Sequence, residues 1–449
     1  MVNQKTTNMN FIKRFFALVL ILNLCSYAYA QEGKKITMNL NECIEYAKQH
    51  NLIVKKAKLS YEQSQVNTYV SKQALYPDLS FSSGQNFSYY AEKQSGTIDK
   101  ASYTGNYGLN SSMTLYNGGR LRKTILQNQK KENISQLEIK DAENNITVSI
   151  IEDYISILYA IETVKIQEAI LKLSEEQLKR SEALLKAGSI SKADYSQLES
   201  ENVSYKYQLI QAQNSLQKAK LELKQLLELR DDIDIVLPNI ENSDVLSLLQ
   251  PLNDVYKKSY DGFIPITNSK NNIELSKLEK SIAKSAYYPT ISLSAALSTG
   301  HTSQSTMNLA NQLKSSLFQS VGFNISVPIF TQGQNKSNVK LADIAIQQYE
   351  IELAVAEKNA WKTIETLYLD AINNQNSFVA AKAKVKSQET SYQLVEEKFN
   401  LGMKNTIELM TERNNLLTAQ QEMLQSKFQA IMSKELMLFY QYQPLDLKY

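Results

Sequence analysis

The chain has 449 residues and a formal charge of +3, with only 13 glycines, 7 prolines, two histidines and two cysteines. So few helix breakers predict long elements, and so small a charge argues against nucleic acid as a partner. After residue 30, no stretch approaches the 18 consecutive apolar residues that indicate a transmembrane helix.

The first 30 residues are typical of a secretory signal peptide. Three basic residues within the first 14 positions precede the apolar run 15–24, and small residues at positions 28 and 30 form a cleavage site. The apolar run is too short to act as a membrane anchor. Cleavage after Ala30 would remove Cys25 and leave Cys43 as the only cysteine, so we expect no internal disulfide.

The remainder of the chain repeats itself. A Tyr-Pro pair and two glycines recur after an offset of 212 residues for the prolines and 214 for the glycines. An internal duplication of this length determines the architecture. We therefore predict two structural repeats, 31–237 and 238–449, each with a helix, two strands, a long helix and a returning helix. The matched positions are Pro77 with Pro289, Gly119 with Gly333, and Gly188 with Gly402.

Each Tyr-Pro pair ends a helix, because proline cannot continue it. The segments that follow alternate between apolar and polar residues. In the clearest of them, every second residue from Val321 to Ile329 is apolar, with Asn324 and Ser326 between. An apolar face opposite a small polar face is typical of a transmembrane β-barrel. The soluble alternative, two hairpins on a core, leaves the strands without a core partner. The predicted strands are about 78–90, 103–116, 290–298 and 320–330.

Four strands cannot close a barrel, and an open sheet edge in lipid leaves backbone groups unpaired at several kcal/mol each. Closure must therefore come from other subunits, and three copies would supply twelve strands. In such a barrel we expect Phe323 to face lipid and Asn324 to face a water-filled passage. The polar connections 91–102 and 298–319 would then face outside the cell.

Each repeat continues into a long helix, predicted over about 119–187 and 334–401. Neither glycine nor proline occurs over residues 120–187 or 334–401. A sustained seven-residue period predicts left-handed supercoiling against neighbouring helices, and so many residues span roughly 100 Å. A spectrin-like bundle is the alternative that the helices alone leave open. The seven-residue positions are Ile150, Ile157, Val164, Leu171, Leu178 and Leu185, then Ile364, Ala371, Phe378, Val385, Tyr392 and Phe399.

Glycines at the ends of these helices predict tight turns, since glycine takes the left-handed conformation without penalty. Ser191 in the first repeat, and Asn405 or Thr406 in the second, are candidate N-caps for the returning helices. We predict those helices at about 192–229 and 406–439. Each repeat therefore contains a hairpin arm about 100 Å long.

Taken in order, these residues resemble the TolC-type outer-membrane efflux protein family over essentially the whole mature chain. The resemblance lies in the opening 36–51, the strand-to-helix turns 115–120 and 327–333, and the tip 401–409; Pro328 lies where family members keep a proline. It implies an α+β, mostly α fold: a homotrimeric 12-stranded barrel in the outer membrane, continued by an α-helical barrel across the periplasm.

The function that the resemblance implies is the exit duct of a tripartite efflux pump or a type I secretion system. The implied partners are outer-membrane lipid, a periplasmic adaptor protein and an inner-membrane transporter, either RND-type or ABC-type. The adaptor would contact the two hairpin tips. The tip residues are Gly188, Ser189, Ile190, Leu401, Gly402 and Met403.

The resemblance also implies a gate at the tips, where family members hold the two arms together by polar bonds. Asp194 matches the family's acid on one arm, and Lys404 matches the base on the other. Glu408 matches the first acid of an inward ring, whereas Thr411 replaces a second acid and Phe399 replaces a tyrosine. We therefore expect the polar contacts that close this gate to differ from those of other family members. For each charge, the alternative is a solvated side chain at a helix end.

We expect no enzyme activity, no cofactor and no bound metal. His50 and His301 are far apart and have no metal-ligand companion at usable spacing. Met403 and Met410 raise the possibility of copper or silver export, but methionines near a tip more often pack. Two further functions stay open besides the duct: a structural coiled-coil protein of the periplasm, and a free-standing porin.

Overall fold

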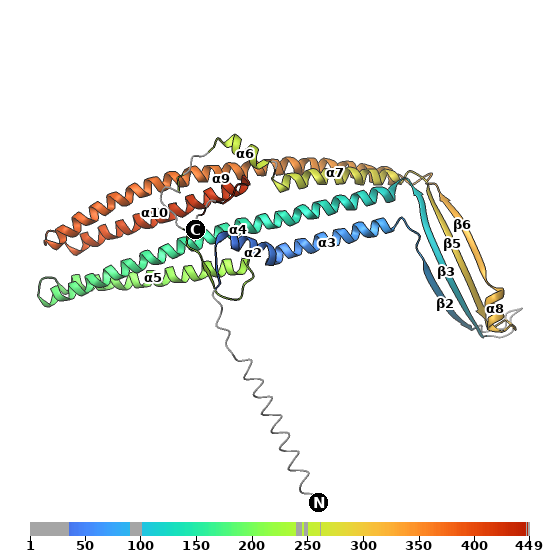
Figure 1. The fold of residues 1–449 in the computed structure, drawn as a ribbon, viewed down its shortest axis with the longest axis horizontal. Coiled ribbons are helices and arrows are strands. Elements are labelled where there is room, and N and C mark those ends of the chain that lie inside the picture. Colours follow the sequence, from blue (N-terminus) through green and yellow to red (C-terminus); the bar gives the residue numbers. More distant parts are fainter. Residues whose placement is uncertain are drawn as a thin grey trace, which may run out of the picture.

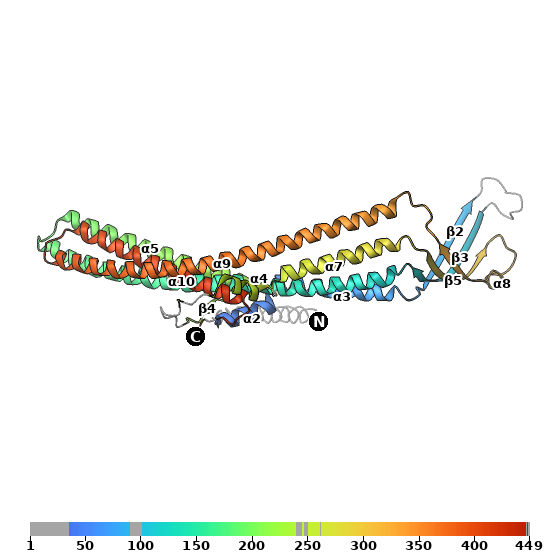
Figure 2. The ribbon, with the colours of Figure 1, turned by 90° about the horizontal axis from the view of Figure 1, so that it is seen from above.

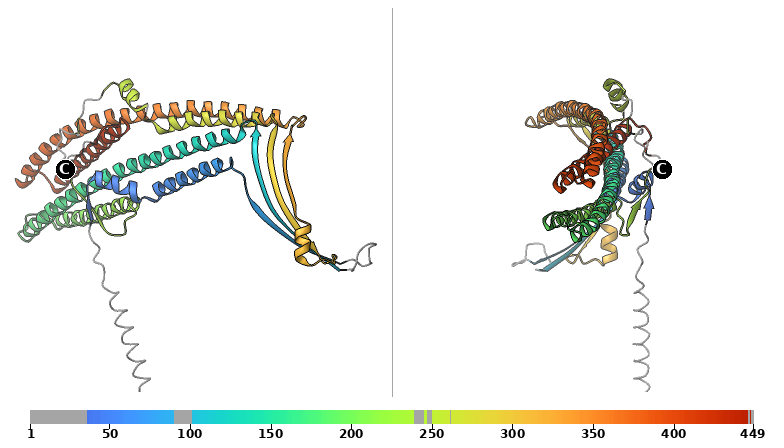
Figure 3. Two further views of the ribbon diagram at one scale, coloured as in Figure 1. Left: turned by 45° about the vertical axis from the view of Figure 1, so that its right-hand side comes forward. Right: turned by 90° about the vertical axis from the view of Figure 1, so that its left-hand side faces the viewer.

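A computed structural model describes residues 36–89, 101–238, 245–246, 250–260, 262–445 and 447. The molecule is elongated, with one β-sheet at one end and two helical hairpins at the other (Figure 1). Seen along the long axis, the helices form a curved layer, and α2, β1 and β4 lie on its convex side (Figure 3). The predicted signal peptide and most of the predicted connection 91–102 lie outside the described residues.

The elements follow the predicted order, with additions. They are β1 (Ile36–Met38), α2 (Leu40–His50), α3 (Leu52–Gln73), β2 (Ser80–Tyr89), β3 (Ala101–Asn117), α4 (Arg120–Lys186), α5 (Lys192–Leu226), β4 (Ile233–Ile235), α6 (Leu252–Tyr260), α7 (Ile264–Ser285), β5 (Thr290–Thr302), α8 (Leu309–Ser315), β6 (Phe318–Ser326), α9 (Gln334–Asn400) and α10 (Thr406–Tyr440).

The four long strands form one antiparallel sheet in the order β2-β3-β5-β6. Its register aligns the apolar positions across neighbouring strands: Leu109 lies opposite both Phe81 and Leu297, and Phe323 lies opposite Leu293. Because side chains alternate along a strand, the intervening serines, asparagines and threonines share the other face. The predicted alternation of an apolar and a polar face is confirmed.

Two strand boundaries differ from the prediction. β6 ends at Ser326 rather than near residue 330, because Pro328 has no N–H to continue the ladder. β5 continues to Thr302 rather than 298, and a short helix, α8, follows it in the segment expected to be an open polar connection. In β3 a bulge between Thr114 and Tyr116 shifts the register, so Tyr116, not Leu115, pairs with Ile291.

The longer β5 also places His301 in a strand, whereas the sequence predicts it within the polar connection 298–319. His301 lies in the ladder opposite Gly105, where the missing side chain leaves room for the imidazole ring. Tyr103 and Tyr107 flank it, with ring centroids 5.4 and 5.9 Å away. Aromatic rings beside a strand glycine cover its backbone, and rings near the end of a transmembrane strand are typical of an interfacial girdle.

Paired left-handed residues connect the sheet to the long helices. Gly118 and Gly119 have φ of +65° and +75°, and the corresponding positions of the second repeat, Gln332 and Gly333, have +52° and +79°. An added Cβ at Gly118 would lie only 2.7 Å from the Ser285 carbonyl oxygen. Gln332, with its φ of +52°, therefore adopts a left-handed backbone conformation that favours glycine.

We predict that Gln332→Gly stabilises the chain by about 0.5–1 kcal/mol, since it relieves the left-handed penalty but adds freedom to the unfolded state. Thermal unfolding of the detergent-solubilised protein, followed by circular dichroism, measures this gain. Gln332→Ala is the control, because it keeps the strained φ and should not raise the midpoint. Equal midpoints for wild type and Gln332→Gly would contradict the argument.

The helices of the two repeats match in length and spacing. The bounds of α9 and α10 each lie 214 positions after those of α4 and α5, and those of α7 lie 212 after those of α3. α4 pairs with α5, and α9 with α10, as two hairpins that lie side by side (Figures 1 and 2). At 1.5 Å per residue, the 67 residues of α4 and of α9 span roughly 100 Å.

The buried seam of α9 follows the predicted seven-residue positions: Ile364, Ala371, Phe378, Val385 and Tyr392 are all buried. In α4 the prediction holds at Ile150 and Ile157 but not beyond. Towards the tip, Leu171, Leu178 and Leu185 are only half-buried. Apart from Ile170, the buried residues there are small or polar ones, which allow close helix approach: Ala160, Gln167, Ser174 and Ser181.

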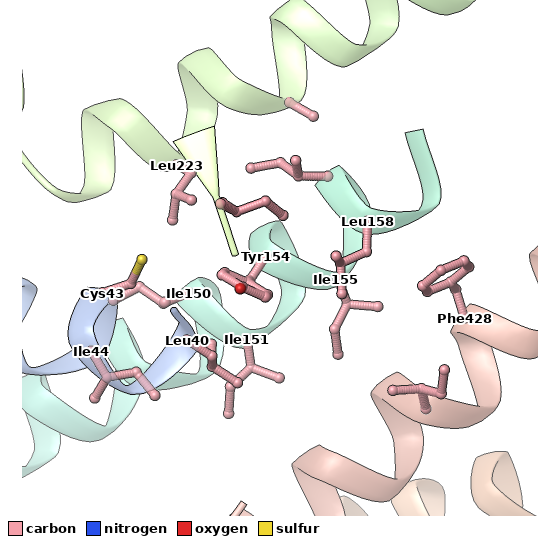
Figure 4. Packing of buried hydrophobic residues seen from close by; sticks show 14 of the residues in the cluster. Leu40, Cys43, Ile44, Ile150, Ile151, Tyr154, Ile155, Leu158, Leu223 and Phe428 are labelled. Carbon is pink, nitrogen blue, oxygen red and sulfur yellow. The ribbon is translucent and has the colours of Figure 1, made fainter. Parts of the chain in front are cut away.

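The largest core lies midway along the molecule, where α2, α4, α5 and α10 meet (Figure 4). Tyr154 is fully buried there, and its hydroxyl donates to the Val236 carbonyl oxygen at 2.6 Å. β1 and β4 pair in parallel beside it, which joins the start of the described chain to the end of the first repeat. Among the described helices, none combines the length and the hydropathy needed to cross a membrane.

Candidate functional site at the hairpin tips

Each hairpin turns at a glycine. Gly188 and Gly402 have φ of +69° and +73°, and an added side chain at either would meet open space. Ser189 N–H donates to the Leu184 carbonyl oxygen, and Met403 N–H to that of Lys398, both at 2.9 Å. These bonds are those of a Schellman turn, as the glycine positions predict.

Both returning helices begin with a reciprocal capping box. Ser191 caps α5: its Oγ accepts from Asp194 N–H at 3.1 Å and donates to the Asp194 carboxylate at 2.6 Å. Asn405, rather than Thr406, caps α10, with its Oδ1 accepting from Glu408 N–H at 2.9 Å. The carboxylates of Asp194 and Glu408 therefore both lie at a helix N-terminus, where the helix dipole stabilises negative charge.

Asp194 and Lys404 do not form the cross-arm ion pair that the resemblance suggested. Lys404 Nζ binds the Glu408 carboxylate one turn along the same helix, and that hydrogen bond lowers the pKa of Glu408. In the described part of the chain no ion pair joins the two residues. The reason is local: each carboxylate already has a capping partner, and Glu408 is the acid nearest to Lys404 in sequence.

An open cleft of about 900 Å³ separates the two tips. Of the residues predicted for the gate, Asp194, Phe399 and Lys404 line this cleft, whereas Glu408 does not. Of those predicted for adaptor contact, Leu401 and Met403 lie outside it and are exposed over 74% and 68% of their surface. The other four line it: Gly188, Ser189, Ile190 and Gly402.

The inner wall of the cleft contains a buried arginine that the sequence analysis missed. Arg413 of α10 is only 5% exposed. Its guanidinium donates to Gln177 Oε1 of α4, which belongs to the other hairpin, and to the Tyr392 hydroxyl of α9 at 3.3 Å. The Tyr392 hydroxyl in turn donates to Glu396 at 3.0 Å. We call Arg413, Gln177 and Tyr392 the Arg413 cluster.

A second polar contact joins the hairpins beside the Arg413 cluster. The Tyr205 hydroxyl of α5 donates to Glu201 at 2.7 Å and lies 3.2 Å from the side-chain oxygen of Asn414 on α10. Glu201 is 8% exposed, and its other carboxylate oxygen has no hydrogen-bond partner. Burial raises the pKa of Glu201, although the Tyr205 hydrogen bond and the Arg413 charge partly oppose that shift.

The sequence does contain a signal for Arg413. It follows Leu409, which is buried, after four residues, and so occupies the apolar stripe of α10. A charge within such a stripe is buried only where partners satisfy it. Arg413 is therefore predictable as a buried, partnered charge from its position in this stripe.

The sheet is antiparallel, with one apolar face and two unpaired edges, and it is joined to two hairpins whose longer helices span roughly 100 Å. This combination defines the class: a protomer of an outer-membrane channel. The comparison with protein families agrees. The model of the outer membrane efflux protein family matches residues 43–228 and 270–435. The chain therefore belongs to this family; it is an outer-membrane efflux channel protein that extends into the periplasm.

Relatives match along nearly the whole chain. The outer membrane protein TolC of Escherichia coli (strain K12) is 18% identical over 429 residues, which are 94% of this chain and 85% of TolC. The cation efflux system protein CusC of Escherichia coli O157:H7 is 22% identical over 386 residues, 85% of this chain and 81% of CusC. These family members are channel proteins rather than enzymes.

Solved structures share the fold. A crystal structure of CusC superposes with a TM-score of 0.78 at 17% identity, covering 93% of this chain and 96% of that one. The outer membrane protein VceC of Vibrio cholerae gives 0.72 at 18% identity, covering 91% of this chain and 97% of the other. The TolC-type resemblance drawn from the sequence is confirmed.

Proposed function

We propose that three copies of the chain form a passive exit duct that a periplasmic adaptor protein connects to an inner-membrane transporter, of RND or ABC type. The observation that supports this most is the continuity of a sheet that is apolar on one face with two matched hairpins, whose longer helices span roughly 100 Å. The two unpaired edges, β2 and β6, need partners in lipid. Edges of neighbouring copies would satisfy them, and the polar faces would line the passage.

Deletion of the gene and complementation test the duct. We expect loss of export in the deletion strain, recovery with the wild-type chain, and small resting conductance of the purified protein in planar bilayers. Two alternatives predict other results. A structural coiled-coil protein of the periplasm would be recovered in the soluble fraction, and a free-standing porin would show large conductance without an adaptor.

We propose that the adaptor docks on the two glycine tips, which are exposed and repeated on both hairpins. Gly402→Trp should reduce export at least tenfold, because a bulky ring would fill the open space at the turn. The amount of assembled protein in outer membranes should stay unchanged. Export measured by cargo accumulation, with membrane fractionation alongside, checks both expectations.

Gly402→Asn is the matched control for that substitution. Asparagine tolerates the left-handed φ of +73° better than other residues with a side chain, and it adds little bulk. Export by Gly402→Asn should therefore stay near that of wild type. Unchanged export with Gly402→Trp would remove the tips from the adaptor interface.

We further propose that the duct rests closed at this end and opens by parting of the hairpins. Three residues of the proposed gate, Asp194, Lys404 and Phe399, line the cleft that such a motion would widen. Glu408, held by Lys404, would supply the acidic charge of the opening. With Thr411 in place of a second acid and Phe399 in place of a tyrosine, this outermost turn has few bonds with which to hold the closed state.

A further inference from the structure

Charge is unevenly distributed where the helices join the sheet. The four strands of the sheet contain no aspartate, glutamate, lysine or arginine. The only acid in the turns that connect sheet and helices is Asp78, which already accepts hydrogen bonds from the Ser112 N–H and hydroxyl. In each of the four helices that join the sheet, the charged residue nearest to it is basic (Figure 1). These residues are Lys72 of α3, Arg120 of α4, Lys284 of α7 and Lys336 of α9.

Four lysines gather where α7 and α9 lie side by side. Lys280 Nζ of α7 binds the Asp343 carboxylate of α9 at 2.5 Å. Lys284 lies one turn further along α7, and Lys336 and Lys340 lie on the two turns of α9 that precede Asp343. The Lys280 hydrogen bond, together with the charges of Lys280, Lys340 and Lys284, lowers the pKa of Asp343. We call Lys280, Lys284, Lys336 and Lys340 the lysine patch.

Most of this positive charge has no partner in the protomer. Lys284, Lys336 and Lys340 are exposed, and within the described residues none of them forms an ion pair or a side-chain hydrogen bond. Asp343 compensates for only one of the four lysines, so the group keeps a charge of +3. A surface with such an excess of one sign favours a partner of the opposite sign.

The lysine patch lies on the outer face of the curved layer of helices. Lys336, Asp343 and Glu357 are separated by multiples of seven residues and therefore share one face of α9. Glu357 accepts a hydrogen bond from the Tyr260 hydroxyl of α6 at 2.7 Å. α6 lies outside the curved layer (Figure 3). In the proposed duct, the lysine patch thus faces away from the passage.

The depth of the lysine patch matches that of lipid headgroups. Residues 287–288 (Tyr-Tyr) and 329–330 (Ile-Phe), in the turns that join the sheet to α7 and α9, are exposed. Exposed aromatic rings of this kind lie at the boundary of the hydrocarbon layer. Lys336 and Lys340 lie only about 3 and 9 Å along α9 from its first residue. Since the headgroup region of one leaflet is roughly 5–8 Å thick and lysine side chains extend into it, their ammonium groups reach the phosphates.

We propose that the lysine patch binds the phosphate groups of anionic phospholipids in the periplasmic leaflet of the outer membrane. Each ammonium group has three donors for phosphate oxygens, and the excess charge complements that of the lipid. Such binding fixes the depth at which the sheet sits in the membrane. The inference rests on the proposed function in one respect, that the apolar face of the sheet meets lipid.

Spin-labelled lipids test this preference on the full chain, reconstituted in phosphatidylcholine vesicles. Labelled phosphatidylglycerol, which is anionic, and labelled phosphatidylcholine, which has no net charge, are compared by the fraction that the protein immobilises. We expect wild type to bind phosphatidylglycerol at least about threefold more strongly, because basic residues near the bilayer surface attract anionic lipid. High salt should bring this ratio of association constants towards one, since it screens exposed charges.

Two variants should change the ratio in opposite directions. Lys284→Gln/Lys336→Gln/Lys340→Gln removes the three unpaired charges and should lower the ratio at least about twofold. Asp343→Asn removes the only acid paired with the patch and frees Lys280, and should raise the ratio.

The matched control removes the same charge far from the sheet. Lys172, Lys179 and Lys206 are exposed on the α4–α5 hairpin, and within the described residues none of them forms an ion pair. Lys172→Gln/Lys179→Gln/Lys206→Gln should keep the wild-type ratio. The amount of each variant in outer membranes, measured in parallel, reports folding.

A wild-type ratio in the triple variant of the patch would overturn the inference, as would an equal loss of preference in the control. Loss of preference when inorganic phosphate is added at constant ionic strength would overturn it too, because the patch would then bind free phosphate rather than lipid. A wild-type ratio of one, with both labelled lipids immobilised, would overturn the inference and leave the proposed function intact. If the wild-type chain immobilised neither lipid, the lipid-facing sheet of the proposed function would itself be wrong.

Discussion

Phe323→Arg is expected to destabilise the sheet by about 2–4 kcal/mol, the cost of this charge near the middle of a transmembrane strand, on the face that we propose to meet lipid. Phe323 is 70% exposed in the protomer and lies in mid-strand opposite Leu293, in the row of apolar side chains that the register aligns. Less Phe323→Arg protein should reach outer membranes, and its assemblies should dissociate at lower temperature. Fractionation and heat-dependent gel mobility measure both effects.

The neighbouring residue supplies the control. Asn324 lies opposite Ser292, among small polar side chains on the other face of the sheet. If that face lines a water-filled passage, the Asn324→Arg guanidinium stays hydrated, and assembly should remain within about 1 kcal/mol of wild type. Greater damage from Asn324→Arg than from Phe323→Arg would invert the assignment of the two faces.

The long elements could be predicted because their signals are redundant along the chain. From Ile364 to Tyr392 of α9 the same apolar spacing recurs in each heptad, and each of these predicted positions is buried, whereas Phe399 nearest the tip is only half-buried. Glycine spacing then placed the two turns, whose left-handed φ values leave few other residues suitable. Sheet register followed from alternation, because a slip of one residue would move the apolar set to the other face.

The features that were predicted wrongly or missed depend on contacts with other segments of the chain. The leucines of α4 near the tip form a regular heptad, yet the protomer buries Gln167 and Ser174 instead, since small and polar residues let helices approach closely. α8 is held by long-range bonds, such as that from Thr299 Oγ1 to the Leu313 carbonyl oxygen. Arg413 lies in the apolar stripe of α10, but that spacing does not identify the partners on α4 and α9 that satisfy its charge.

The buried Glu201 predicts that the resting duct closes more firmly as the pH falls. In this structure, which we propose to be the closed state, burial is the largest influence and raises the pKa of Glu201 above its ordinary value of 4.5, to which it should return when parted hairpins expose it. The closed state thus binds a proton more tightly than the open state. The charged and polar groups that face this carboxylate are Tyr205 on its own helix, and Arg413 and Asn414 on α10.

The direction of this pH dependence follows from the linkage between proton binding and closure. A group with a raised pKa in the closed state stabilises that state fully below its ordinary pKa, and loses this contribution as the pH rises through the raised value. Open probability in planar bilayers should therefore fall as the pH is lowered from 7 towards 4.5. Linkage to a single proton limits the change to at most about tenfold per pH unit.

Glu201→Gln separates this effect from other titrations, because glutamine keeps a hydrogen-bond acceptor for Tyr205 but does not ionise. The variant should be more closed than wild type at pH 7 and should lose most of the pH dependence in this window. Burial also raises the pKa of Asp153, near the molecule's middle, to about 6, with the Glu222 and Glu152 charges adding to the shift. That titration should persist in Glu201→Gln as a change in thermal stability near pH 6. An unaltered pH profile of open probability in Glu201→Gln would mean that the carboxylate beside the Arg413 cluster takes no part in closure.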